Sequence, residues 1–264
     1  MGIVFRLFFL FFALAAGLAF GVIVIAPSTY ERVTVASADA QLTAAGHLLR
    51  QLESTEHLQR AQLARSIATN PRLVATMAPP AVPGVVTQVD PHVAAAALEA
   101  SMPAASAAQR VDLVALLDNK RSVLDARSRG TSLDAAELVT KLADRDGALL
   151  HIGTHLVGVA AAPVLDANET VVARVLVARE YDQAVVADRR SHVGMPIAYF
   201  SGHDLLATDL TDQNDRSMVN ALVLRTDVAE LTDPGRATPR EKEYNERRIR
   251  SVTFSLADGS GDLF

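Results

Sequence analysis

Two histidines four residues apart form the part of this sequence that most resembles a metal site. His151 and His155, in "HIGTH", have the i, i+4 spacing at which two imidazoles on one helix can share a zinc ion. However, Gly153 and the flanking apolar alternation favour strands over a helix, and the glutamate of zinc hydrolases is missing. We therefore interpret the pair as half-exposed histidines at a strand edge, and we predict no metal and no cofactor.

Motifs that indicate the common enzyme classes are absent from the sequence. It contains no Gly-x-Ser-x-Gly elbow, no Walker loop and no Gly-x-Gly-x-x-Gly. The sequence therefore contains no motif that would indicate a hydrolase or a nucleotide-binding protein. There is no cysteine, which excludes thiol chemistry and disulfides. Because no nucleophile, base and orienting group can be named together, we do not expect an enzyme.

Small residues along one apolar segment suggest a binding function instead. Gly158 and the alanines 160–162 leave space where bulky side chains would normally fill a core. That space serves either as a ligand pocket or as a surface on which a helix packs closely, and the sequence leaves both interpretations open.

Four polar residues on neighbouring elements are candidate ligand contacts: Arg127, His155, Arg174 and Tyr181. If they converge, they would suit a small anion, because arginine clamps a carboxylate with two parallel hydrogen bonds. In the alternative interpretation the two arginines face solvent, or pair with the aspartates at positions 125 and 166.

The first part of the chain predicts a membrane helix. Residues 7–26, "LFFLFFALAAGLAFGVIVIA", contain no charged side chain, and about 20 apolar residues match a hydrocarbon core of roughly 30 Å. A signal peptide has a shorter apolar region, and Pro27 disfavours cleavage after "VIA". We expect an uncleaved single-pass anchor in a bacterial inner membrane.

Charge gives the expected orientation and one excluded partner. Residues 1–6 would form a short cytoplasmic tip containing Arg6, which leaves the bulk of the chain extracytoplasmic. The formal net charge is −5, and such a mildly acidic chain gives no reason to expect nucleic acid as a partner.

A long amphipathic helix is expected over residues 28–70. Leu49 and Leu63 belong to its helical apolar spacing, while Glu56 and Arg60 interrupt a heptad pattern. We therefore expect this helix to pack on its own domain, and we expect a homodimer to form through it.

The remaining chain alternates between helices and strand pairs. Ser132 or Thr131 is expected to cap the helix that ends before Gly147, and Asn168 to take the left-handed position in the corner "DANE". The expected strand pairs are 111–118 with 122–128, the hairpin 158–182 and a pair turning at Ser201-Gly202; the expected helices begin at 91, 132, 181 and 211, and a charged connector follows over 232–248.

This order, together with two motifs, resembles the Cache superfamily of extracytoplasmic sensors. The motifs are "VALLDNKRSVLDARS" and "GVAAAPVLDANETVVARVLVARE", each an apolar strand, an Asp-led turn and a returning strand. Where the family has turn glycines, this chain has Arg121 and either Asn168 or Glu169. Members that bind amino acids carry a Tyr/Arg/Trp/Asp set, and the absence of tryptophan argues against that subtype.

The resemblance implies an α+β fold: a transmembrane helix continuing into a long helix, then PAS-like antiparallel sheets. It implies a first, distal sensor module at 71–193 and a second, incomplete module at 194–264. The implied function is ligand sensing by a membrane signal-transduction receptor, with a small molecule, a small anion in particular, as its partner. The alternative is a membrane-anchored scaffold that recruits a partner protein through the amphipathic stretch 38–67.

The end of the chain carries one more expectation. The second module still lacks central strands after "VTFSLADGSGDLF", and no second apolar span follows residue 26. We expect further strands, a second membrane helix and an output domain to lie beyond Phe264.

Overall fold

The computed structural model describes the backbone of residues 3–78, 91–101, 111–129, 133–201, 203–224, 239–244 and 247–253. Side chains are described from Arg32 onward within these ranges, except at some positions of the later helices and strands. The chain divides into two compact units, and each is described by itself. One comprises Met1–Gly46 with Ala237–Thr253, and the other His47–Arg236 with Phe254–Phe264.

Helix α1 (Ile3–Ala68) is the longest element and runs through both units. Its bounds confirm the prediction that one helix continues from the predicted membrane span into the long helix after it. The side chains of the predicted span 7–26 lie outside those that are described. In the part of the chain that is described in full, no helix is long and apolar enough to cross a membrane.

The first unit adds a hairpin to the N-terminal part of α1. Strands β8 (Arg240–Tyr244) and β9 (Arg247–Ser251) pair antiparallel, and the Arg250 guanidinium donates to both carboxylate oxygens of Asp39 at 3.0 and 2.9 Å. The expected charged connector is thus wrong over these residues. Opposite charges face each other across the strands, as in Glu241 opposite Arg250, and this pairing stabilises a hairpin despite its low apolar content.

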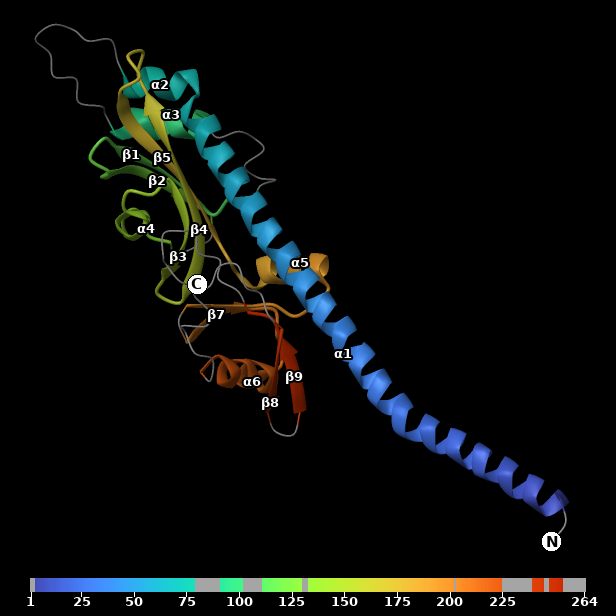
Figure 1. Ribbon diagram of the computed structural model, residues 1–264. Coiled ribbons are helices and arrows are strands. Elements are labelled where there is room, and N and C mark those ends of the chain that lie inside the picture. The colour runs from blue at the N-terminus through green and yellow to red at the C-terminus, as the bar shows by residue number, and fades with distance from the viewer. Residues whose placement is uncertain are drawn as a thin grey trace, which may run out of the picture. The chain divides into compact units, whose positions relative to one another are not determined.

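The second unit is built on a five-stranded antiparallel sheet in the order β2-β1-β5-β4-β3 (Figure 1). Side chains along each strand point alternately to the two faces of the sheet. Because both faces are buried, the central strands carry near-continuous apolar runs. The strands are β1 (Leu113–Asp118), β2 (Val123–Ser128), β3 (Gly147–Ile152), β4 (His155–Leu165) and β5 (Val171–Glu180). Both motifs quoted above therefore form the hairpins that the sequence predicts.

Helices cover both faces of this sheet (Figure 1). The C-terminal part of α1, with α2 (Pro71–Met77) and α3 (Pro91–Ser101), packs on one face through Ile67, Leu73 and Leu98. Helix α4 (Ala135–Leu142) packs on the other through Leu138 and Leu142. The long helix thus packs on its own domain, as predicted from its interrupted heptads.

Later elements follow the predicted order with shifted boundaries. Asp134, rather than Ser132 or Thr131, caps α4. The helix ends at Leu142, before Ala143 with φ 50°, and Gly147, the predicted stop, already belongs to β3. The described residues of the predicted second module form separate two-stranded sheets, and that module stays a prediction. Its elements within the second unit are α5 (Gln183–Val193), β6 (Ala198–Ser201), β7 (Asp204–Thr208) and α6 (Gln213–Leu224).

Both hairpin corners place a non-glycine residue in the left-handed region. Arg121 has φ 67° and Glu169 has φ 62°, so the second corner strains Glu169 and not Asn168. In each corner an aspartate holds the turn: the Asp166 carboxylate accepts the backbone N–H groups of Asn168 and Thr170 at 2.8 Å each. These are the corners at which the resemblance implies glycine.

Replacing Glu169 by glycine is expected to stabilise the second unit. The substitution removes a left-handed strain of about 1–2 kcal/mol and adds about 0.5–1 kcal/mol of backbone entropy cost, so we expect a net gain of up to about 1 kcal/mol. Urea unfolding measures it. Asn168→Gly is the matched control, because Asn168 has no positive φ and glycine there should only destabilise. Equal effects of the two substitutions would contradict this account.

Candidate functional site

The structure separates the four predicted ligand contacts onto opposite faces of the sheet. Arg127 pairs in register with Val114, whose side chain belongs to the α1-covered core, and Tyr181 also points toward α1. Arg174 pairs in register with Leu117, on the α4-covered face, and His155 joins that same face. The four side chains therefore do not form one site.

Each of the four has a partner within the chain. Arg127 is half exposed and donates to Asp125 at 3.0 Å, the alternative that the sequence left open. Arg174 Nη1 lies 3.6 Å from Asp146 Oδ1. The partner is thus Asp146 and not Asp166, which the sequence suggested as the alternative. The other two bind Glu180 and Glu53: His155 Nδ1 lies 2.5 Å from a Glu180 oxygen, and the Tyr181 hydroxyl donates to Glu53.

The two histidines, predicted at a strand edge, lie on either side of the turn between β3 and β4. His151 is the last but one residue of β3 and His155 is the first of β4, with Gly153 at φ 58° between them. Because His151 pairs with Leu156 and His155 with Ile152, the two imidazoles leave opposite faces of the sheet. Among the described residues no cluster of His, Asp or Glu forms a candidate metal site.

The space above the small residues of β4 is filled by an arginine of α1. A Cβ added to Gly158 would lie 2.6 Å from Cζ of Arg60. Glycine at this position therefore lets a guanidinium group lie flat against the sheet. Close helix packing, one of the two interpretations left open, holds at Gly158.

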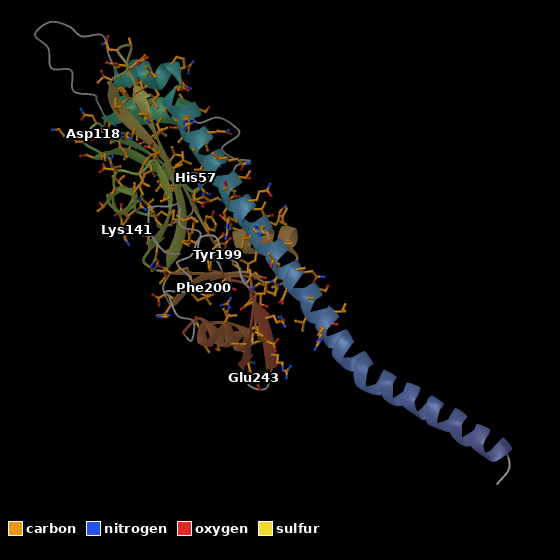
Figure 2. All side chains as sticks on the ribbon, in the orientation of Figure 1. His57, Asp118, Lys141, Tyr199, Phe200 and Glu243 are labelled. Atoms are coloured by element: carbon orange, nitrogen blue, oxygen red, sulfur yellow. The ribbon has the colours of Figure 1, made fainter. Side chains whose placement is uncertain are left out.

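A buried ionic cluster joins α1 to the elements that follow the sheet. Glu53 of α1 is only 6% exposed, and its carboxylate accepts three hydrogen bonds. The donors are the Tyr181 hydroxyl, the Tyr199 hydroxyl at 2.7 Å and Arg189 Nε at 3.1 Å. Figure 2 labels Tyr199, which comes from β6. A buried carboxylate needs such donors, because burial without them costs several kcal/mol.

One helical turn farther, Glu56 gathers the arginines of the cluster. Its carboxylate pairs with Arg179 Nη1 at 2.8 Å, with Arg189 Nη2 and with Arg60 Nη1 at 3.4 Å. Arg189 Nη1 also lies 3.7 Å from an oxygen of Asp188, so three carboxylates, those of Glu53, Glu56 and Asp188, pair with three guanidinium groups. The formal charges of this cluster therefore balance.

Arg60 is the least satisfied member of this cluster. It is 6% exposed, and both of its hydrogen bonds are long: Nη1 donates to Glu56 and to the Tyr181 hydroxyl at 3.4 Å each. Its Cζ lies 5.9 Å from the centre of the Tyr181 ring, within cation–π range. Its Nε is buried and has no partner among the described residues.

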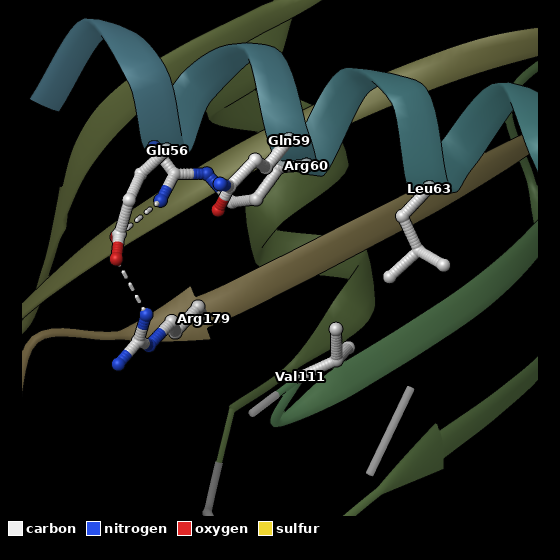
Figure 3. Close-up of a pocket in the computed structure, with 6 residues that line it drawn as sticks. All are labelled: Glu56, Gln59, Arg60, Leu63, Val111 and Arg179. Carbon is white, nitrogen blue, oxygen red and sulfur yellow. Dashed lines mark hydrogen bonds and ion pairs between the residues drawn. The ribbon is translucent and has the colours of Figure 1, made fainter. Parts of the chain in front are cut away.

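A small pocket lies at this incompletely bonded arginine (Figure 3). It is partly open to solvent and has a volume of about 20 Å³, space for roughly one water molecule. Four of its residues come from α1, one precedes β1 and one belongs to β5. They are Glu56, Gln59, Arg60, Leu63, Val111 and Arg179.

Sequence reasoning missed this cluster, although its signal is present in the chain. Glu53, Glu56 and Arg60 continue the spacing of Leu49 and Leu63 along α1, so they occupy the stripe that faces the core. Charged residues on a buried stripe indicate an internal ionic site. Interpreting them only as interruptions of a heptad overlooked that.

Comparisons with known proteins bear on the fold. No protein-family model and no curated protein sequence matches this chain. The periplasmic domain of LuxQ from Vibrio cholerae is similar in structure, with TM-score 0.53, 12% identity, and coverage of 81% of this chain and 99% of that one. The ligand-binding domain of the Campylobacter jejuni chemoreceptor Tlp3, solved with L-valine, has TM-score 0.52, 11% identity and coverage of 87% and 91%.

The fold is Cache-like. In this chain an antiparallel sheet packs against a long N-terminal helix, and the sheet contains both hairpins that the two motifs predict. At such low identity the comparison supports the fold alone. Any ligand of this Cache-like chain has to be inferred from its own residues.

The two tyrosines at Glu53 are expected to resist deprotonation. Burial raises the pKa of both hydroxyls, and the negative charge of Glu53 raises it further. Because the folded-state pKa lies above the unfolded value of about 10, the stability they contribute is complete below pH 10 and is lost as the pH rises above it.

A pH titration followed by absorbance at 295 nm, which reports tyrosine ionisation, tests this prediction in the unmodified chain and in the Tyr199→Phe variant. In the folded state the rise near pH 10 should equal that of the unmodified chain, since Tyr199 does not ionise there. In urea the variant should lose about one quarter of the rise, because the chain has four tyrosines. The same loss in the folded state would show that the Tyr199 hydroxyl is accessible.

Gly158→Ala is expected to displace the Arg60 guanidinium. The added methyl group would lie 2.6–2.8 Å from Cζ, Nη1 and Nη2, and we expect a loss of about 1–3 kcal/mol in the free energy of unfolding, as for an overpacked core. In an Arg60→Ala background the same substitution should cost much less, so a double-mutant cycle isolates the contact. An equal cost in both backgrounds would place the strain elsewhere.

Proposed function

We propose that this chain is the extracytoplasmic ligand-sensing region of a membrane signal-transduction receptor. It binds a small molecule at the pocket beside Arg60 and relays the change through α1. The Cache-like fold supports this, because both similar structures are receptor domains, LuxQ being described as periplasmic and Tlp3 as ligand-binding. We propose binding and not catalysis, since the pocket holds ionic and amide groups but no nucleophile paired with a base.

One observation carries the proposal: α1 supplies four of the residues that line the pocket, β5 supplies Arg179, and Val111 comes from the segment before β1. A ligand in this position contacts both elements at once. It shifts α1 relative to the sheet only if it binds one arrangement more tightly than the other, which is the general requirement for a ligand-driven switch. The partly buried ion pair between Glu56 of α1 and Arg179 of β5 couples the same two elements.

The finer parts of this function belong to the same proposal. Residues 7–26 anchor the chain in the inner membrane as a single pass with residues 1–6 in the cytoplasm, and the chain forms a homodimer through its long helix. The apolar run of residues 7–26 supports the anchor, and the extension of α1 through it without a break supports a mechanical relay.

Thermal shift of the full chain in detergent tests ligand sensing. Panels of small carboxylates, amines and purines at millimolar concentration should include at least one compound that raises the melting temperature. A ligand at 100 times its Kd stabilises by about 2.7 kcal/mol, which is a measurable shift. Leu138→Ala, a cavity in the α4-covered core, is the control for nonspecific effects, since it should melt lower and keep the ligand-induced shift. No stabilisation by any of the three panels would remove the proposed function.

A further inference from the structure

The corner between β4 and β5 contains an asparagine that the turn itself does not use. Asn168 is exposed, and its carboxamide bonds to no residue in the described part of the chain. Asparagine normally serves a turn by bonding to the backbone or by taking the left-handed conformation. Here the Asp166 carboxylate bonds to the N–H groups of Asn168 and Thr170, and Glu169 has the positive φ. The turn therefore leaves the Asn168 carboxamide without a structural role.

The corner between β1 and β2 has the same geometry without asparagine at the equivalent position. The Asp118 carboxylate accepts the N–H groups of Lys120 and Ser122 at 2.8 and 2.7 Å, and Arg121 has the positive φ. Lys120 thus occupies the place that Asn168 occupies in the other corner. Because the same turn forms around a lysine, turn geometry does not explain the asparagine.

The sequence around this asparagine is the acceptor motif of N-glycosylation, Asn-x-Ser/Thr. Residues 168–170 read Asn-Glu-Thr, and no other asparagine of the chain has Ser or Thr two residues after it. The motif serves as an acceptor on surface loops of exported chains, and residues 167–170 are all exposed. We propose that Asn168 is an acceptor site for an N-linked glycan. The inference goes beyond the proposed function and rests on its extracytoplasmic placement.

Glycan transfer to Asn168 is a substitution at a sugar carbon. The donor is an oligosaccharide joined through C1 of its first sugar to a lipid diphosphate, and the catalyst is an oligosaccharyltransferase. Asn168 Nδ2 forms a bond to C1 while the bond from C1 to the diphosphate oxygen breaks. The electron pair of that bond leaves with the lipid diphosphate, and one Nδ2 proton passes to a base of the enzyme. The exposed Thr170 hydroxyl, which bonds to no described residue, is available for recognition by that enzyme.

The glycan would stand at the far end of β5 from the ionic cluster. Strand β5 begins at Val171, directly after the corner, and ends at Glu180, the residue before Tyr181. At about 3.3 Å per residue, the length of this strand separates the corner from the cluster by roughly 30 Å. A bulky, solubilising glycan on Asn168 therefore leaves the pocket beside Arg60 unobstructed.

Modification of the purified full chain in detergent tests the acceptor. The chain is incubated with an oligosaccharyltransferase that recognises Asn-x-Ser/Thr and with its lipid-linked oligosaccharide, and intact mass spectrometry counts the glycans. We expect one glycan on the unmodified chain and none on Asn168→Gln or Thr170→Val. Asn119→Gln is the control and should keep its glycan, because Asn119 is exposed in the other corner but lacks the motif.

Lys120→Asn is the matched gain-of-function variant. It creates Asn-Arg-Ser at 120–122, in a corner held by an aspartate in the same way. We expect this variant to carry two glycans. A single glycan at position 120 would show that the corner geometry suits the enzyme while Asn168 is not an acceptor, and it would overturn the assignment.

Expression of the full chain in bacterial cells that carry the same enzyme and donor separates this inference from the proposed function. A glycan on Asn168 in the cells as well as on the purified chain is the expected result. No glycan on the purified unmodified chain would remove the site and leave ligand sensing standing. A glycan on the purified chain but none in the cells would contradict the extracytoplasmic placement, so the proposed function and the cellular modification would fail together.

Discussion

Burying ionised side chains on one face of a helix constrains everything that packs against that face. Glu53 and Glu56 lie among the core-facing positions of α1, and a carboxylate leaves water only where donors replace its hydration. For Glu53, the donors are Tyr181, Tyr199 and Arg189, which come from three later parts of the chain. The positions of α5 and β6 relative to α1 are thereby fixed by hydrogen-bond geometry as well as by apolar packing.

This ionic cluster is more specific than a hydrophobic contact would be. Apolar side chains tolerate small slides along a helix, whereas removing one partner of a buried ion pair leaves an uncompensated charge that costs about 3–5 kcal/mol. A one-turn shift of α1 would separate Glu53 from both tyrosines at once. An element with such discrete packing passes on a small displacement as a change between two arrangements, and this property supports the relay through α1 that we propose.

Much of the fold was predictable because it depends on local patterns. Alternating apolar residues and Asp-led corners predicted both hairpins of the sheet, and helical spacing predicted α1 and its packing on its own domain. The hairpin of β8 and β9 was missed, because its stability comes from charge pairs across the strands, such as Glu241 with Arg250. Local apolarity carries no sign of such pairs.

The sequence by itself determined the long helix and both hairpins of the sheet. It also determined that Arg174 and Val175 leave opposite sides of β5, because a strand's side chains alternate with period two. It did not determine which polar residues meet. Arg127, His155 and Arg174 lie on strands of one sheet and Tyr181 follows β5, yet the register of these strands divides the four between two faces. Only the tertiary structure brought Glu56 to Arg179, 123 positions away, because burial on both elements, and not proximity in sequence, decides where charges must pair.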